Sequence, residues 1–401
     1  LTESVGKLRG DPGTTVILSV LIDKAAQSKL VTLKREIIVI PTVESASLEG
    51  NFGYIKIRNF QDDTSQCLNE HLKRLKMSTD KLKGLIVDLR NNSGGLLDQA
   101  IEVADKFLEI GDIVITVGPG GHPREVAEAR KTDTDEALYP MVVLVDAGSA
   151  SGAEIVAGAL KENDRAIIVG DRSFGKGSVQ QLIELMDGSA LKLTIAKYLT
   201  PLSTDIQSVG ITPDIKLLPV TVAKDNINLF RGIVALREED LKQHLDEHRK
   251  DETPFAILKY YLETKEKDKD KDKTEEPEEE AGDPYKLPDF NTDFHVIFAK
   301  KLLTKATAWQ RENFLQNSSP VLEETARSEE KKIALALQKL DIDWSAGTGT
   351  GTVKTNASFS SNPINRRAKA GDKITLTIHV ANVGKAPLYQ VRGISSSKNG
   401  L

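Results

Sequence analysis

The sequence predicts an α/β core, a mixed sheet with flanking helices, with smaller parts on both sides of it. Between residues 44 and 222, short apolar runs alternate with longer amphipathic runs, the pattern of strands followed by helices. The runs LIVDL and VVLV are almost continuously apolar, which predicts strands buried on both faces. Outside the core we expect a small β domain (1–43), a helical extension (223–263), a charged linker (264–283), a helical segment (284–345), and a hinge with a β segment (346–401).

The small β domain reads as helix, turn, strand, turn, strand. Its first turn is RGDPGT, in which Pro12 and Gly13 favour a reversal of the chain. The stretches TVILSVLI and LVTLKREIIVI alternate between apolar and polar residues, which predicts strands of a half-exposed sheet. In the core, the predicted strands are GYIKIRNF, GLIVDLR, IVITVG, MVVLVDA and AIIVG, and the predicted helices lie around SQCLNEHLKRLKM, LLDQAIEVADKFLEI and AEIVAGALKEN.

After the core, the sequence pattern passes from helical spacing to a charged run, back to helical spacing, and then to a Gly/Thr-rich hinge with a β segment. NLFRGIVALREEDLKQHL and FAILKYYLE have helical spacing, and so do FHVIFAKKLLTKA and ARSEEKKIALALQKL further on. Between these pairs, TKEKDKDKDKTEEPEEEAGD is almost wholly charged, which is typical of a solvated linker. The Gly/Thr-rich hinge SAGTGTGT then leads to KITLTIHVANVG, whose period of two predicts a strand.

Composition narrows the class of protein. The 401 residues suggest two to four domains, and 39% hydrophobic content supports a core. The net charge of −5 does not favour binding to nucleic acid or to an acidic membrane, and no run is long enough to span a bilayer. The single cysteine, Cys67, lies in an amphipathic helix and cannot form an internal disulfide. The chain opens with LTESVGKLRG, which reads as the middle of a domain, so we expect a segment before it.

Ser151 and Lys176 are the residues that point most clearly to chemistry. Ser151 opens a predicted helix after the strand MVVLVDA, and Lys176 follows the strand AIIVG. A strand–helix–strand unit returns the chain to the same edge of a sheet, so the two side chains are expected to meet there. A hydroxyl beside a lysine in a partly dry cleft can serve as a nucleophile with its base. This pair predicts hydrolysis of acyl bonds.

Ser151 also has a purely structural interpretation. Ser151-x-x-Glu154 fits a capping box, in which the hydroxyl accepts an amide hydrogen bond and the carboxylate reaches back. Against this, Gly152 and its neighbours are small enough to let a substrate backbone approach. The amides at a helix start would also stabilise an oxyanion.

Lys176 lies in FGKGSVQQ, between two glycines and near Phe174 and Val179. A loop lysine is usually just exposed. Apolar neighbours, however, remove water from an ammonium group, and a desolvated lysine is a better base at neutral pH. Gln180, four residues later, either orients the amine or is an ordinary surface residue of a strand.

A third candidate is the turn DLRNNSGG, residues 88–95, directly after the buried strand GLIVD. It ends in Gly94 and Gly95, whose bare amides are expected at the same edge of the sheet as Ser151. Together with the amide of Gly152 they could form an oxyanion hole. The alternative is a plain turn between a strand and a helix.

Other chemistries have less support. The six histidines are scattered; His244 and His248 share helical spacing, but in a strongly charged segment without a metal-binding motif. A Ser-His-Asp triad would have to use His71 or His122, and neither has a supporting motif. GDRSFGKGS resembles a phosphate-binding loop only in outline, because GKG replaces GK[ST]. The sequence therefore predicts no metal, nucleotide or other cofactor. The histidines are His71, His122, His244, His248, His295 and His379.

Taken together, the motifs resemble those of the C-terminal processing peptidases, also called tail-specific proteases. These are serine proteases with a Ser–Lys dyad and a PDZ domain. The resemblance covers residues 1–218 and is carried by RGDPGTTV, GYIKIRNF, GLIVDLRNNSGGLL, GSASGAEIVAGAL, VGDRSFGKGSVQQ and YLTPLSTDIQSVGITPDI. The resemblance implies that Ser151 is the nucleophile, Lys176 the general base and Gln180 the residue that positions the lysine. Some members have an aspartate where this chain has Glu162.

The resemblance also implies an oxyanion hole of the Gly94, Gly95 and Gly152 amides. Residues 1–43 resemble the later half of a PDZ domain, which captures the C-termini of its ligands. Residues 364–401 resemble the start of an immunoglobulin-type β-sandwich. Family members act outside the cytoplasm, mostly in the bacterial periplasm, on proteins with unstructured C-terminal tails. We therefore expect an extracytoplasmic serine endopeptidase. The alternatives are a catalytically inactive peptide-binding adaptor of the cell envelope, and an acyl hydrolase that is not a protease.

Overall fold

The structure is a computed structural model of the whole chain. The residues that it describes are 6–20, 28–36, 41–79, 81–132, 136, 138–224, 226–229, 235–241, 252–263, 286–342, 344, 353–361 and 374–382. The chain divides into two compact units. The first comprises Leu1–Pro213, Leu236–Glu252 and Asp272–Phe314, and the second comprises the remaining segments.

The first unit is built on a sheet with strand order β9-β8-β5-β4-β3. Strands β4, β5, β8 and β9 are parallel, and β3 pairs antiparallel with β4, so the predicted mixed sheet is confirmed. Every residue of β5 and β8 is buried, because helices cover both faces of the sheet. The strands are β3 Val43–Leu48, β4 Phe52–Ile57, β5 Gly84–Asp88, β8 Met141–Val145 and β9 Ile167–Gly170.

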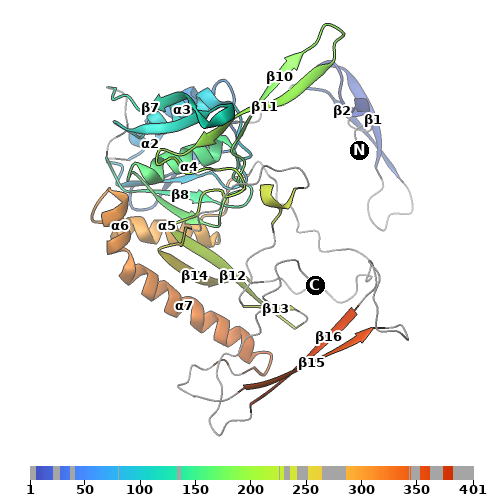
Figure 1. Cartoon of the computed structure of the whole chain (residues 1–401), viewed down its shortest axis with the longest axis vertical. Coiled ribbons are helices and arrows are strands. Elements are labelled where there is room, and N and C mark those ends of the chain that lie inside the picture. Colours follow the sequence, from blue (N-terminus) through green and yellow to red (C-terminus); the bar gives the residue numbers. More distant parts are fainter. Residues whose placement is uncertain are drawn as a thin grey trace. The chain divides into compact units, whose positions relative to one another are not determined.

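Helices α2, α3 and α4 share one apolar core with this sheet, and α5 contacts β5, β8 and β9 from the opposite face (Figure 1). The shared core alternates along the strands, so that Ile55, Val87 and Val143 face the three helices. This layering leaves the carboxyl ends of the parallel strands open to receive loops. The helices are α2 Thr64–Met77, α3 Leu97–Asp105, α4 Gly152–Glu162 and α5 Phe294–Lys305.

A second sheet of the first unit has the order β10-β11-β6-β7 and is antiparallel throughout. A short 3-10 turn, η1, joins β6 to β7. The predicted N-terminal strands form the antiparallel ribbon β1–β2, and residues 37–40 of the second predicted strand lie outside the described residues. The bounds are β1 Thr15–Val20, β2 Lys29–Lys34, β6 Asp112–Val117, η1 Pro119–Gly121, β7 Pro123–Glu128, β10 Ser178–Glu184 and β11 Ala190–Leu199.

The second unit contradicts part of the predicted helical extension. FAILKYYLE contains strand β14, which pairs parallel with β12. The described part of NLFRGIVALREEDLKQHL has only the last residue of β13 and the 3-10 turn η2, which belongs to the first unit. Helix α7 packs on β12 and β14, where Val220, Ile333 and Leu337 form a small core. The bounds are β12 Ile215–Ala223, β13 Asn226–Asn228, η2 Glu238–Asp240, β14 Ala256–Tyr261 and α7 Ser319–Gln338.

The segment after the charged linker has helices α5, α6 (Arg311–Asn317) and α7. The linker itself, 264–283, lies outside the described residues. Near the C-terminus, β15 (Val353–Ser361) pairs antiparallel with β16 (Ile374–Asn382); the rest of the predicted immunoglobulin-like segment is outside the described residues. None of the described helices combines the length and the apolar character that crossing a bilayer requires.

Candidate active site

Ser151 is the N-cap of helix α4, after the turn that follows β8. Its backbone has φ 53°, a left-handed conformation that residues other than glycine seldom adopt and that is often found at functional sites. Ser151 and Glu154 occupy the positions of a capping box, but only the return half is a hydrogen bond of ordinary geometry: the Ser151 amide donates to Glu154 Oε2 at 2.8 Å. The half-buried hydroxyl takes the position of the other half of the box without forming a cap hydrogen bond of ordinary geometry.

Lys176 lies in the loop between β9 and β10, residues 171–177, which we call the lysine loop. This loop runs directly beside the start of α4. The Lys176 amide donates to Glu154 Oε2 at 2.9 Å, so it shares this oxygen with the Ser151 amide. The Phe174 amide donates to the Ser149 carbonyl at 2.9 Å, which holds the loop against the turn before Ser151. The structure therefore brings the backbones of Ser151 and Lys176 together, although they are far apart in the sequence.

The side chains of the pair are not hydrogen-bonded to each other among the described residues. Lys176 is half-buried. Lysine carries its amine on a flexible four-carbon stem. The conformation of that stem therefore sets how close the amine comes to the hydroxyl.

The Glu154 carboxylate connects the start of α4 to the lysine loop, because it accepts hydrogen bonds from both. The side chain is fully buried, and it also accepts hydrogen bonds from the Ser173 hydroxyl at 2.5 Å and the Gly175 amide at 2.7 Å. Burial raises the pKa of Glu154 to about 7, even though all of its hydrogen bonds favour the charged form. The sequence motif around Glu154 indicated only half of a capping box and gave no sign of these contacts with the lysine loop.

The turn at Gly94 and Gly95 lies against Ser151, as predicted from their shared edge of the sheet. A Cβ atom on Gly94 would lie 2.7 Å from Ser151 Cβ and 2.9 Å from the Gly152 nitrogen. Gly94 has φ 96° and Gly95 has φ 146°, conformations that favour glycine. The turn is therefore shaped for close approach to the start of α4.

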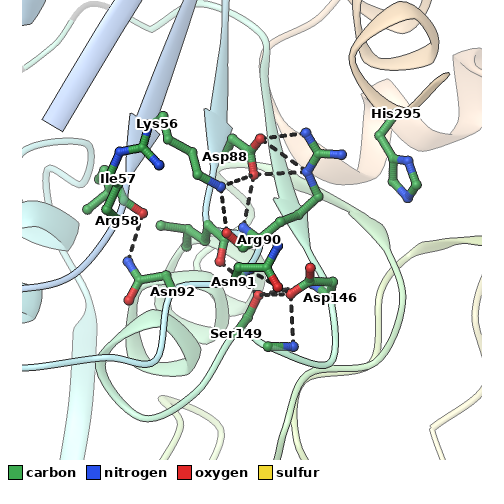
Figure 2. Close-up of polar contacts among 12 residues, drawn as sticks. Lys56, Ile57, Arg58, Asp88, Arg90, Asn91, Asn92, Asp146, Ser149 and His295 are labelled. Carbon is green, nitrogen blue, oxygen red and sulfur yellow. Dashed lines mark hydrogen bonds and ion pairs between the residues drawn. The ribbon is translucent and has the colours of Figure 1, made fainter. Parts of the chain in front are cut away.

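One predicted role needs correction. The Gly94 amide donates to Asn92 Oδ1 at 2.8 Å, so it is already occupied and is not free to bind an oxyanion. Among the described residues, the amides of Gly95 and Gly152 have no acceptor. Asn92 is itself buried and donates to the Ile57 carbonyl at 2.9 Å, a bond that ties the turn to the end of β4 (Figure 2).

A buried ionic network supports this turn from the end of β5. Asp88 has no exposed surface and receives hydrogen bonds from Lys56 at 3.2 Å and from Arg90 at distances down to 2.6 Å (Figure 2). Tyr54 donates to the same carboxylate at 2.7 Å. Burial alone would raise the pKa of Asp88, but the charges of Arg90 and Lys56 hold it well below its usual range. The carboxylate is therefore ionised and fully paired.

Arg90 extends the network to helix α5. It donates to both carboxylate oxygens of Asp293, at 2.9 and 3.2 Å, and Asp293 caps α5 by accepting from the Val296 amide at 3.2 Å. His295 follows on the same helix and lies on the side of Arg90 away from Lys56 (Figure 2). Burial and the nearby Arg90 charge lower the pKa of His295 to about 4, so the imidazole is neutral near pH 7. The motif DLRNNSGG contains Asp88 and Arg90 but did not indicate their role.

The remaining predicted residues lie further from the pair. Gln180 is exposed on β10, next to an irregularity in its pairing with β11. Glu162 lies at the other end of α4, where it accepts from the Thr200 hydroxyl at 2.8 Å and the Leu202 amide at 2.7 Å. Glu162 therefore holds the turn after β11. His244 and His248 lie outside the described residues.

Gln207 is a positioning residue that the sequence did not reveal. Its side chain is buried, and it accepts from the Gly177 amide at 3.0 Å while it donates to Glu238 at 2.9 Å. It therefore holds the lysine loop on the side away from Glu154. It lies in YLTPLSTDIQSVGITPDI, one of the stretches that carry the family resemblance, but nothing in that stretch indicated this contact.

Comparison with known proteins gives a consistent result. Residues 51–217 match the family described as Peptidase family S41. A carboxy-terminal-processing protease of Bartonella bacilliformis is 43% identical over 252 residues, which cover 61% of this chain and 56% of the relative. A chloroplastic carboxyl-terminal-processing peptidase of Arabidopsis thaliana is 37% identical over 54% of this chain and 43% of the relative. Among solved structures, a photosystem II D1 C-terminal processing protease matches with 32% identity and a TM-score of 0.41, over 52% of this chain and 56% of that one.

Residues 51–217 therefore carry the match to peptidase family S41, and a relative from Staphylococcus saprophyticus that is 37% identical is named a probable CtpA-like serine protease. Other relatives of this chain are carboxy-terminal-processing proteases of bacteria and chloroplasts. The match spans about half the length of these relatives.

Proposed function

We propose that this protein is a serine endopeptidase that cleaves proteins recognised by their C-terminal tails, with Ser151 as nucleophile and Lys176 as general base. The observation that carries the proposal is the shared oxygen, Glu154 Oε2, which accepts from the amides of both residues at 2.8 and 2.9 Å. The left-handed backbone of Ser151, and its hydroxyl without a cap hydrogen bond of ordinary geometry, add support.

The proposed reaction proceeds in two steps. Neutral Lys176 accepts the proton of the Ser151 hydroxyl, and the oxygen attacks the peptide carbonyl carbon. The amides of Gly95 and Gly152 donate to the oxyanion of the tetrahedral intermediate. The lysine ammonium then protonates the departing amine, the C–N bond breaks, and an acyl-enzyme remains. Lys176 next deprotonates a water molecule, which attacks the ester, releases the new carboxylate and regenerates Ser151. In this proposal Gln180 orients the amine when substrate is bound.

The proposed substrates are proteins whose unstructured C-terminal tails enter the site in an extended form. Residues 1–43 would contribute the later half of a PDZ domain, a module that captures such tails. An envelope adaptor is a further proposed partner. The proposed location is extracytoplasmic, in keeping with relatives that are bacterial and chloroplast processing proteases.

A cleavage assay tests this function directly. The full chain is incubated with a protein that ends in an apolar, unstructured tail, and the products are identified by mass spectrometry. Wild type is expected to cleave and Ser151→Ala is not, while both bind the substrate. Cleavage by both proteins, or by neither, would contradict the proposal and leave the adaptor as the better interpretation. Activity on small esters alone would point to a different acyl hydrolase.

Gly94→Ala is expected to lower kcat by about 100-fold, because a displacement of roughly 1 Å at a reacting group can cost that much. The new methyl group would lie 2.7 Å from Ser151 Cβ and 2.8 Å from the Ala150 carbonyl oxygen, so the turn or the nucleophile must move. Gly121→Ala is the matched control, since Gly121 also has a positive φ, 80°, but no atom within 4 Å of the added carbon. Equal activity of both variants would show that the close approach at Gly94 is not needed.

A further inference from the structure

A buried carboxylate joins the two halves of the proposed dyad. Glu154 has no exposed surface, and each of its oxygens accepts two hydrogen bonds. Oε1 binds the lysine loop alone, through the Ser173 hydroxyl at 2.5 Å and the Gly175 amide at 2.7 Å. Oε2 binds one donor from each side, the amides of Ser151 at 2.8 Å and Lys176 at 2.9 Å. One atom therefore connects the backbone of the proposed nucleophile to that of the proposed base.

The Glu154 carboxylate receives hydrogen bonds from uncharged donors, and among the described residues no cation pairs with it. Its four partners are three amides and a hydroxyl, and the charged groups on the surrounding segments bind elsewhere. On the lysine loop, Asp171 pairs with Arg237 at 3.0 Å and Arg172 pairs with Glu239, and on the turn before Ser151 the Asp146 carboxylate accepts from the amides of Asn91 and Gly148. The Lys176 amine, on the same loop, makes no ion pair among the described residues. The strength of the connection therefore depends on the charge of Glu154 itself.

Protonation would weaken all four bonds. Hydrogen bonds to an ionised acceptor are roughly twice as strong as those to a neutral one. A protonated carboxyl group also carries an O–H donor, which would face a ring of donors. Because burial raises the pKa of Glu154 to about 7, this change falls within the neutral range.

We propose that Glu154 is a positioning residue that holds Lys176 against Ser151 only while its carboxylate is ionised, so that the site assembles as the pH rises. The inference rests on the proposed function. The direction follows from the charge: as the pH falls, Glu154 gains a proton, the amides of Ser151 and Lys176 lose their charge-assisted partner, and the loop loosens. Lys176 must also be unprotonated to act as a base, so cleavage requires two groups to lose protons.

The test measures kcat and KM against pH for wild type, Glu154→Gln and Glu154→Asp, with Glu162→Gln as the matched control. Glu162 is on the same helix and its carboxylate also accepts two hydrogen bonds, but it does not contact the lysine loop. In wild type, the slope of log kcat on the acid side is expected to approach two. In Glu154→Gln the slope is expected to be one, with kcat about 100-fold lower at pH 8 and KM nearly unchanged. Glu154→Asp should keep the slope of two with an intermediate rate, and Glu162→Gln should match wild type.

Two results would overturn the inference: a Glu154→Gln variant with wild-type kcat and slope, or a wild-type slope of one. If Glu154→Gln does not fold, as judged by circular dichroism, the Glu154→Asp profile decides, with a slope of two in support and a slope of one against. Absence of any Ser151-dependent cleavage by wild type, at any pH, would instead contradict the proposed function itself. The two failures are therefore distinguishable.

Discussion

Replacing Lys176 by methionine is expected to lower kcat for peptide cleavage by about 1,000-fold at pH 8, because a general base contributes roughly 100- to 10,000-fold to a rate. Methionine keeps the unbranched apolar stem, so the half-buried position should stay filled. Lys176→Arg is expected to be equally inactive, because a guanidinium group stays protonated and cannot accept the Ser151 proton. Kinetics with a fluorogenic peptide, together with thermal unfolding of each variant, would check both results.

The arginine variant separates two roles for the lysine. If Lys176 supplied only positive charge to the site, Lys176→Arg would retain most of the activity, and the general-base role would be wrong. Lys73→Met is the matched control, because Lys73 is an exposed residue of helix α2 that lies outside the proposed site. It should leave kcat unchanged.

The juxtaposition of Ser151 and Lys176 could be predicted from the sequence because it depends on topology. Strands β8 and β9 are short apolar runs, and the helix between them must return the chain to the same edge of the sheet. The turn at Gly94 and Gly95 could be placed there for the same reason, since it follows the neighbouring parallel strand β5. Local pattern and chain direction were enough for these residues.

The contacts that hold the site could not be predicted in this way. Glu154 fits a capping box, and nothing in that motif indicates that its carboxylate also accepts amides from a loop 21 and 22 residues away. The Arg90–Asp293 pair joins residues 203 apart, with no shared pattern. Such contacts arise from the packing of helices, strands and loops in the folded protein. The local sequence pattern around each residue does not indicate them.

Strand β14 shows where local pattern was misleading. FAILKYYLE is short and mostly apolar, so it fits a buried helix as well as a strand. In the fold, Ala256–Tyr261 pairs with β12 in parallel register from Ile215↔Ala256 to Val220↔Tyr261, and its burial alternates. An available strand edge and the β-branched and aromatic residues of the segment decided between the two states.

Arg90→Met is expected to lower the free energy of unfolding by about 3–5 kcal/mol, because it leaves the fully buried Asp88 carboxylate without its main counter-charge. It also removes the pair with Asp293 that ties the end of β5 to helix α5. Lys131→Met is the matched control, since the Lys131–Glu109 pair lies on the surface with side chains 65% and 41% exposed, and such pairs contribute less than about 1 kcal/mol. Urea unfolding followed by circular dichroism would measure both values.

The pH dependence of unfolding identifies the cause of this loss. A carboxyl group whose pKa is lower in the folded state adds stability above its ordinary pKa, and the stability is lost as the pH falls. In wild type, Arg90 and Lys56 hold the pKa of Asp88 well below its usual range, so this stability is lost progressively as the pH falls from the ordinary pKa of an aspartate into strong acid. Without Arg90 the pKa of Asp88 should rise, less of this stability remains to be lost, and the difference in the free energy of unfolding between wild type and Arg90→Met should shrink as the pH falls. The double variant Arg90→Met, Asp88→Asn removes the buried charge as well, and should recover part of the stability; a double variant no more stable than Arg90→Met would show that packing around the guanidinium, and not the unpaired carboxylate, is the cause.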